Sequence, residues 1–276
     1  MNFGSVNSCN VVLMSNDPHL TEIHHFAQIL QELGVSFRAI FSGSDKYPST
    51  KLFGGGTKTI VVTPSLEIAL SDDARRVYQN VDIVYIAPFF AASNNVNWNT
   101  IKQVLCFGEL PALELARLGA NAITVIGPLG LEHQKNESEF TITWVTDSDD
   151  KTEQNNVSSL VDGSLLVVPE SVNIAQIAGK SSYIMFDKMS NNFAKSIVFG
   201  CKPIYWKKTT KPENSWAAQV LDPVPVFRRL ESLVNIIAEY DNYSCALWTI
   251  CKKLAAKELN PKVEVSKWWA TQSDKQ

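Results

Sequence analysis

The chain has 276 residues, of which 45% are hydrophobic and 19% are charged, which is ordinary usage for a globular protein. A chain of this length buries roughly 70–75% of the surface of its unfolded form, so it needs no disulfide or metal ion to hold a core together. The formal net charge of −3, without a long basic run, argues against a nucleic-acid-binding surface.

The cysteines and the first residues indicate a reducing compartment. The 5 cysteines are an odd number and form no C-x-x-C pair, a pattern typical of thiols outside disulfides. Met1–Ser5 has neither the basic residues nor the apolar core of a secretory signal, and no apolar run reaches the roughly 18 residues that span a bilayer. We therefore expect a cytoplasmic protein without a transmembrane segment.

Strand and helix patterns alternate from the first apolar run onward. Val11–Met14 predicts a strand, and Ser15–Pro18 predicts a turn and a helix start. Apolar residues then recur at helical spacing until Gly34, at Ile23, Phe26, Ala27, Leu30 and Leu33. Ser36–Phe41 predicts the next strand, and this order predicts a parallel pair with a right-handed crossover.

The same unit recurs as far as residue 126. Strands are expected at 59–62, 82–86, 103–107 and 122–126. One helix is expected at Asp72–Tyr78. Another follows Gly108, with apolar residues at Ala112, Leu115, Ala116 and Leu118.

A change in composition marks a boundary between two lobes. Glu132–Glu139 and Asp147–Asn156 are polar and nearly free of aliphatic residues, and they bracket one strand at Phe140–Val145. We place the boundary near 132–139. The chain is then divided into an N-terminal α/β lobe, 1–135, and a C-terminal α/β lobe with closing helices, 136–276.

The second lobe repeats the alternation. Its strands are expected at 164–168, 183–186 and 203–206, its helices at 174–178 and 192–199, and a mostly helical tail from Val226 to about Lys257. The predicted fold class is α/β, with two Rossmann-like lobes, mainly parallel sheets and a helical C-terminal tail.

Two glycine motifs are weak candidates for phosphate binding. Gly54–Thr57 lacks the Lys-Ser/Thr pair of a P-loop and precedes a strand, so it favours a flexible turn. Gly108 provides only one of the three glycines of a dinucleotide-binding turn. Neither motif predicts a cofactor.

His19 is the candidate catalytic residue among the histidines. The spacing of His19, His24 and His25 is not the i, i+4 pair of a helical metal site, so no metal is expected. His19 lies in the first strand–helix loop, at the sheet edge where open α/β sheets bind ligands. Asp17 is near enough in sequence to orient it, and a His with an acidic partner can act as a general base. The alternative is a plain cap or loop residue.

The segment from His19 to Phe37 resembles the first helix of GT-B-fold glycosyltransferases, which use nucleotide sugars and have two Rossmann-like lobes. That family often has a His after the first strand, an Ala eight residues on and a Gly fifteen on. Here these are His19, Ala27 and Gly34. The resemblance implies that His19 is the base that deprotonates the acceptor hydroxyl.

The segment from Asp187 to Trp206 is similar to the donor-binding strand, loop and helix of the same family. The resemblance implies donor phosphates at the loop and helix N-terminus. The implied donor-binding residues are Ser190, Asn191, Asn192, Lys195, Gly200, Trp206, Glu213 and Asn214. Aromatic and basic groups in Tyr205–Lys208 are suited to stack on a base or sugar and to hold phosphate.

Two residues depart from the pattern of that family. Lys195 stands where an acidic residue usually grips the ribose, and Asp187 stands where many members have a phosphate-binding His or Gly. A lysine can pair with a phosphate, whereas an aspartate repels one.

Three functions remain open from the sequence. The first is a glycosyltransferase-like enzyme that moves a sugar from a nucleotide donor to a hydroxyl of a small-molecule or glycan acceptor, without a cofactor. The second is a non-catalytic α/β binding or scaffold protein, which the loss of the donor carboxylate favours. The third is a cyclase like uroporphyrinogen-III synthase, whose strand order is similar at 82–92, 104–119 and 165–170 but whose Gly-Pro-Thr-Thr-like turn is missing from 210–276.

Overall fold

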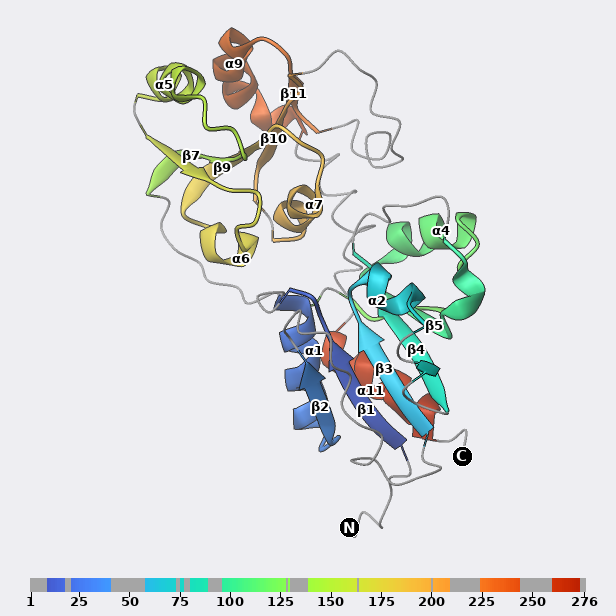
Figure 1. Cartoon of the computed structure of the whole chain (residues 1–276). Coiled ribbons are helices and arrows are strands. Elements are labelled where there is room, and N and C mark those ends of the chain that lie inside the picture. Colours follow the sequence, from blue (N-terminus) through green and yellow to red (C-terminus); the bar gives the residue numbers. More distant parts are fainter. Residues whose placement is uncertain are drawn as a thin grey trace. The chain divides into compact units, whose positions relative to one another are not determined.

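The computed structural model describes residues 9–17, 21–40, 58–72, 75–76, 80–88, 96–127, 129, 139–162, 164–199, 201–208, 224–243 and 260–273. The chain forms two compact units, each built on a parallel sheet (Figure 1). The first lobe consists of Met1–Gly130 together with Lys257–Gln276, and the second lobe is Leu131–Ala256.

The sheet of the first lobe has its strands in the order β2-β1-β3-β4-β5-β6, and every described pairing is parallel. The strands are β1 (Cys9–Met14), β2 (Phe37–Ile40), β3 (Lys58–Thr63), β4 (Val81–Ile86), β5 (Gln103–Cys106) and β6 (Ile123–Val125). The apolar runs of the inner strands β1, β3, β4 and β5 are buried, as parallel strands between helix layers require, whereas the edge strands β2 and β6 are only partly buried. The expected parallel pairing of the first two strands is confirmed.

Helices cover both faces of this sheet (Figure 1). They are α1 (Thr21–Glu32), α2 (Leu66–Leu70), the 3-10 turn η2 (Trp98–Thr100), α4 (Glu109–Arg117) and α11 (Pro261–Ser273). α1 buries Ile23, Phe26 and Leu30, and the turn after its last residue, Glu32, includes Gly34, whose φ of +72° lies in the left-handed region. Of the helix expected at 72–78, only Arg75 and Arg76 are described as helical, and α2 precedes it.

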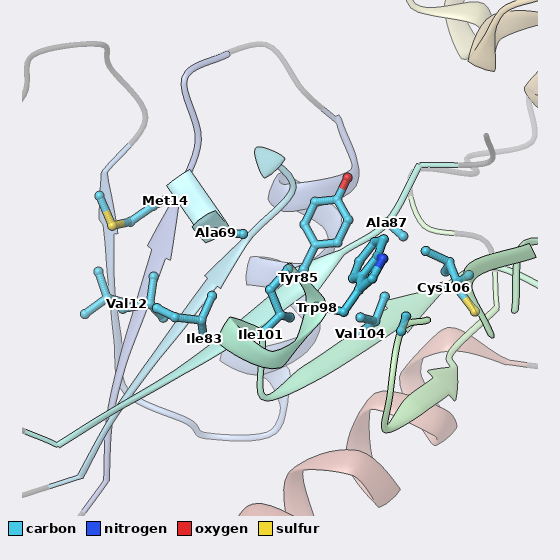
Figure 2. Packing of buried hydrophobic residues seen from close by; sticks show 13 residues of the cluster. Val12, Met14, Ala69, Ile83, Tyr85, Ala87, Trp98, Ile101, Val104 and Cys106 are labelled. Atoms are coloured by element: carbon cyan, nitrogen blue, oxygen red, sulfur yellow. The ribbon is translucent and has the colours of Figure 1, made fainter. Parts of the chain in front are cut away.

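Figure 2 shows buried residues of the core between the first sheet and helix α2, a cluster that also includes Leu115 of α4. Tyr85 of β4 and Trp98 of η2 pack with ring centroids 6.4 Å apart. Cys106 is buried and donates its S–H to the carbonyl oxygen of Gly108 at 3.6 Å. Burial raises the pKa of this thiol to about 12, so Cys106 is a packing residue and not a nucleophile.

Helix α11 completes the other face of the first lobe beside α1 (Figure 1). Its Trp268 is 2% exposed and packs on Phe26 with ring centroids 5.6 Å apart. Gln103 Oε1, at the start of β5, accepts hydrogen bonds from Trp268 Nε1 at 2.9 Å and from Gln272 Nε2 at 3.2 Å. The structure therefore differs from the expected division into 1–135 and 136–276, because the last helix buries its indole in the first lobe.

The sheet of the second lobe has the order β11-β10-β9-β7-β8, again with parallel pairings throughout the described strands. The strands are β7 (Phe140–Val145), β8 (Leu165–Val168), β9 (Ser181–Phe186), β10 (Pro203–Trp206) and β11 (Val226–Phe227). The predicted fold class, two α/β lobes with parallel sheets, is confirmed.

One helix of the second lobe, α5, was not predicted from the sequence, because its segment is polar. The helices are α5 (Lys151–Leu160), α6 (Ile174–Ile177), α7 (Asn191–Val198), η3 (Leu230–Ser232), α9 (Leu233–Ala238) and η4 (Tyr240–Tyr243). α5 begins where Asp150 caps it by accepting hydrogen bonds from the N–H groups of Thr152 and Glu153. The tail expected to be helical from Val226 begins instead with β11, which pairs with β10.

Candidate functional site

Charged and hydroxyl side chains gather at the carboxyl edge of the second sheet. The residues that follow the strands are Thr146 and Asp147 after β7, Glu170 after β8, Asp187 and Lys188 after β9, and Lys208 after β10. Because parallel strands end at a common edge, these residues meet although they are far apart in the sequence. Open α/β sheets bind ligands at this edge.

On the α5 face of this edge, the ammonium of Lys208 lies among two indoles and two carboxylates. Its Nζ is 4.7 Å from the ring centroid of Trp144 and 4.4 Å from that of Trp206. The same Nζ pairs with Glu153 Oε2 of α5 at 2.5 Å and with Asp187 Oδ2 at 3.2 Å. Cation–π and ion-pair attraction act together on one cation. We call this group the Lys208 cage.

Trp206 is a core residue of the second lobe. Its side chain is 6% exposed, and its ring stacks on Phe227 with centroids 5.7 Å apart and planes 12° apart. Trp144 packs against the same ring at 5.4 Å, and Trp206 Nε1 donates to the carbonyl oxygen of Arg228 at 3.3 Å. The indole is thus buried among aromatic side chains in this structure, and the stacking role expected of Trp206 stays a prediction.

On the α7 face, Asp147 and Lys188 form an exposed ion pair beside Glu170. Lys188 Nζ lies 3.0 Å from Asp147 Oδ2, and the Glu170 N–H donates to Asp147 Oδ1 at 3.0 Å. The hydrogen bond from Lys188, and next that from the Glu170 N–H, hold the pKa of Asp147 below its usual range. The bond to Asp147 likewise raises the pKa of Lys188. Because both side chains are more than half exposed, the pair adds little stability.

Glu170 has two buried carboxylate oxygens that form no hydrogen bond within the described part of the chain. Asp187 Oδ1 and Ser190 Oγ are in the same condition, so four of the six such atoms among the described residues belong to this edge. The Ser190 hydroxyl is near the Glu170 carboxyl but does not reach hydrogen-bonding geometry. Burial raises the pKa of Glu170, and nearby Asp147 adds to the rise, whereas Ser190 and Lys188 oppose it.

Four of the residues expected to bind a donor, Ser190, Asn191, Asn192 and Lys195, lie on α7 or at its N-cap, and they lie at different ends of the helix. Ser190 is the N-cap of α7, but its side chain caps no backbone N–H, and Asn191 begins the helix. Asn192 Nδ2 donates to the carbonyl oxygens of Glu170 and Val172, the latter at 3.3 Å, so it ties the first turn of α7 to the segment after β8. Lys195 lies in the last turn of α7, away from the helix N-terminus.

Comparison with known proteins finds a match in structure but not in sequence. No known protein family and no curated protein matches the chain. The wall teichoic acid polymerase TagF superposes with a TM-score of 0.66 at 8% identity, over 98% of this chain and 89% of that one. The spinosyn rhamnosyltransferase SpnG gives 0.57 at 8% identity (93% and 99%), and the spinosyn forosaminyltransferase SpnP gives 0.56 at 10% (96% and 99%). The chain has the GT-B glycosyltransferase fold.

In a GT-B fold the first lobe also has a carboxyl edge, and Asp17 lies on it after β1. Its N–H donates to Ser15 Oγ at 3.1 Å, and that hydroxyl donates to the Asp17 carbonyl oxygen at 2.8 Å, which closes a tight turn. His19, the expected base, lies outside the described residues, as do the expected donor residues Gly200, Glu213 and Asn214. The roles of these residues stay predictions.

Two further findings concern metals and membranes. The described ranges contain no group of three or more His, Cys, Asp or Glu that could hold a metal ion. No helix described in the two lobes is long and apolar enough to cross a bilayer.

Sequence reasoning did not single out Glu153, Glu170 or Lys188. Glu170 carries a usable signal, because it follows the apolar run of β8 and a proline, which places it at the carboxyl edge. Lys188 carries the same signal after β9. Glu153 carries none, because it belongs to a polar segment whose helical structure depends on the Asp150 cap.

Proposed function

We propose that this protein is a glycosyltransferase that moves a sugar from a nucleotide donor to a hydroxyl acceptor. The observation that carries the proposal is the carboxyl edge of the second sheet, where buried polar atoms without partners lie on a GT-B fold. Buried polar groups in native proteins are nearly always satisfied, so a cluster of unsatisfied ones points to a ligand site.

The proposed chemistry divides between the two lobes. On the second lobe, the donor phosphates face the N-terminus of α7 at Ser190–Asn192, where backbone N–H groups favour an anion. On the first lobe, His19 takes the proton of the acceptor hydroxyl, with Asp17 as its orienting carboxylate. The acceptor oxygen bonds to the anomeric carbon, the carbon–oxygen bond to the diphosphate breaks, and the nucleoside diphosphate leaves with the electron pair.

The nucleotides bound to proteins of similar fold indicate which donors should be tested. The HepE protein of Anabaena, with a TM-score of 0.51, was solved with UDP and glucose, and SpnG, with a TM-score of 0.54, with thymidine diphosphate. The likeness to uroporphyrinogen-III synthase gains no support from the comparisons.

A second candidate function is that of a non-catalytic binding protein. It is favoured by the Lys208 cage. Lys208 already forms ion pairs with Glu153 and Asp187, so its ammonium is not available to pair with a donor phosphate. An edge of this charge resists an anionic donor.

The deciding experiment measures binding and turnover separately. Wild-type protein is heated with UDP, CDP and TDP and with their sugar conjugates, and a ligand at about 100 times its dissociation constant should add about 2.7 kcal/mol to stability. His19→Ala should keep that shift but lower turnover by about 10²–10⁴, because a general base acts in the transition state. His24→Ala, at an exposed position of α1, is the matched control and should turn over normally.

The outcomes separate the hypotheses. Binding with turnover that depends on His19 supports the transferase. A shift without any product supports a binding protein that takes nucleotide sugars, and no shift with any nucleotide contradicts the transferase.

A further inference from the structure

Strand β8 ends the second sheet, and no described strand pairs with its outer side. In the order β11-β10-β9-β7-β8 its neighbour is β7. The carbonyl oxygens of Ser164 and Val168 accept hydrogen bonds from N–H groups of β7 and of the residue after it, at 3.2 and 2.9 Å. Because main-chain groups alternate in direction along a strand, Leu165 and Val167 direct their N–H and C=O groups away from β7. These four groups have no hydrogen-bond partner in the described part of the chain.

This edge lacks the features that usually keep the edges of sheets apart. Natural edge strands are protected by charged residues, prolines, bulges or very short length. β8 has the sequence Leu-Leu-Val-Val, and all four residues are partly exposed. By contrast, β2 at the edge of the first sheet carries the exposed Arg38, and the edge strands β6 and β11 have three and two residues. Among the described edges, β8 is therefore the best suited to pair with a further strand.

The surface around β8 is poor in charge. Asp162 and Glu170 are the charged members of the 26 residues 154–179, although about five would be expected at the 19% of the whole chain. Both lie outside the strand, since Asp162 has a φ of +53° in the turn before β8 and Glu170 follows Pro169. The same stretch forms most of α5 and all of α6, which lie on opposite sides of the second sheet (Figure 1). Depletion of charge is typical of the core of a protein–protein interface.

A second copy of the chain fits this edge better than a charged partner does. A basic or acidic protein finds little opposite charge here, whereas two nearly neutral surfaces do not repel each other. An antiparallel pair of β8 strands can place Leu166 opposite Leu166 of the second copy, so that Leu165 and Val167 exchange hydrogen bonds in both directions. This register satisfies all four outward groups of each copy. It also brings α5 beside α5 of the second copy, where the exposed side chains of Asn155 and Asn156 carry no charge.

We propose that two copies of this protein associate through β8 and thereby join the sheets of their second lobes into one continuous sheet. The interface is isologous, with the two-fold axis at Leu166. Its main-chain hydrogen bonds replace bonds to water, so the association is weak, with a dissociation constant between about 1 µM and about 1 mM. The proposal does not depend on the transferase activity, because β8 is argued from its own main-chain groups and surroundings.

The test measures association and its dependence on Leu166. Sedimentation of wild-type protein from about 1 µM to about 1 mM should show the monomer passing into a dimer. Leu166→Lys should raise the dissociation constant at least about tenfold, because like charges then meet at the two-fold axis. Val226→Lys is the matched control, since it places the same charge on β11 at the opposite edge of the same sheet, and it should dimerise as wild type does.

A mixture of two variants separates a lost contact from a lost fold. Leu166→Glu alone should be as monomeric as Leu166→Lys, but the two variants mixed in equal amounts should associate, because opposite charges then meet across the axis. A variant that had failed to fold would not recover in this way. Absence of association in the mixture, when both variants melt cooperatively, overturns the proposed register.

Hydrogen exchange tests the strand without any substitution. The amides of Leu165 and Val167 should exchange about tenfold more slowly once most chains are dimeric, whereas those of Leu166 and Val168, which face β7, should be protected at every concentration. A wild-type protein that stays monomeric over the whole range overturns the proposal. A dimer that Leu166→Lys leaves intact, or whose formation does not slow exchange at Leu165 and Val167, overturns it as well.

Discussion

Glu170 should lower the stability of the folded protein at neutral pH. Its pKa is raised from the ordinary value of 4.5, chiefly by burial, so the folded protein holds this proton more tightly than the unfolded chain does. Stability is therefore lost as the pH rises from the unfolded pKa through the folded one. Glu170→Gln, which stays neutral, should melt at a higher temperature than wild type at pH 7, and the difference should shrink toward pH 4. Equal melting temperatures at pH 7 would contradict this account of the site.

Lys208 and Lys188 should differ although both are lysines at the same edge. Lys208 is the cation beside Asp187, whose side chain is 8% exposed, so Lys208→Ala leaves a buried carboxylate without its charge partner. We expect the unfolding free energy, measured with urea, to fall by about 1–3 kcal/mol. The tryptophan emission should change as well, because the ammonium lies over Trp144 and Trp206.

The control is Lys188→Ala, which removes an ion pair between two exposed side chains. It should unfold close to wild type, because such pairs are screened by water and salt. Equal losses of unfolding free energy for Lys208→Ala and Lys188→Ala would show that burial of Asp187 does not determine how much the Lys208 cage stabilises the protein.

Residue-scale contacts were the hardest to predict from the sequence. Trp206 and Lys208 lie at a strand end, a position that the sequence indicates correctly, but burial of the indole depends on Phe227, about twenty residues later. The pairing of Lys208 with Glu153 depends on α5, which the sequence does not reveal. A pattern within one segment carries no information on such partners.

Among the elements, α11 should be essential to the first lobe. Trp268 is 2% exposed, packs on Phe26 and donates to Gln103 Oε1, so Trp268→Ala removes an indole and leaves a half-buried amide oxygen with one donor fewer. The expected cost in unfolding free energy is about 3–5 kcal/mol. The comparison is Trp269→Ala, at a half-buried neighbouring position, which should cost less. A smaller loss for Trp268 than for Trp269 would contradict the packing described here.

Elements were predictable where one local signal sufficed. β7 and β10 have the bounds expected from the sequence, because β-branched and aromatic residues, which favour strands, fill most positions of both. α5 was missed because Val157 is its only side chain classed as buried, and polar residues otherwise make it look like a linker. α11 was not predicted, because its buried face includes the polar Gln272. The hydrogen-bond partner of this side chain, Gln103, is distant in the sequence.

At the scale of the whole molecule, the alternation of strands and helices was enough to predict two parallel α/β lobes. The candidate site was harder to predict, because Asp147, Glu170 and Asp187 come from three strand ends that only the sheet order brings together. The resemblance to GT-B proteins directed attention to the residues of α7, but not to the carboxylate that follows β8.

The first lobe is built from two segments that are far apart in the sequence, and this has a consequence for synthesis on the ribosome. Residues up to Gly130 emerge early, whereas Lys257–Gln276 emerge only after the second lobe has been made. At ordinary translation speeds this delay is on the order of 10 s. Throughout it, the face of α1 around Phe26 lacks the indole of Trp268 that covers it in the finished protein. Nascent chains stalled at residue 250 should therefore carry a first lobe that proteases cut readily, so the lobe that is translated first reaches its final packing last.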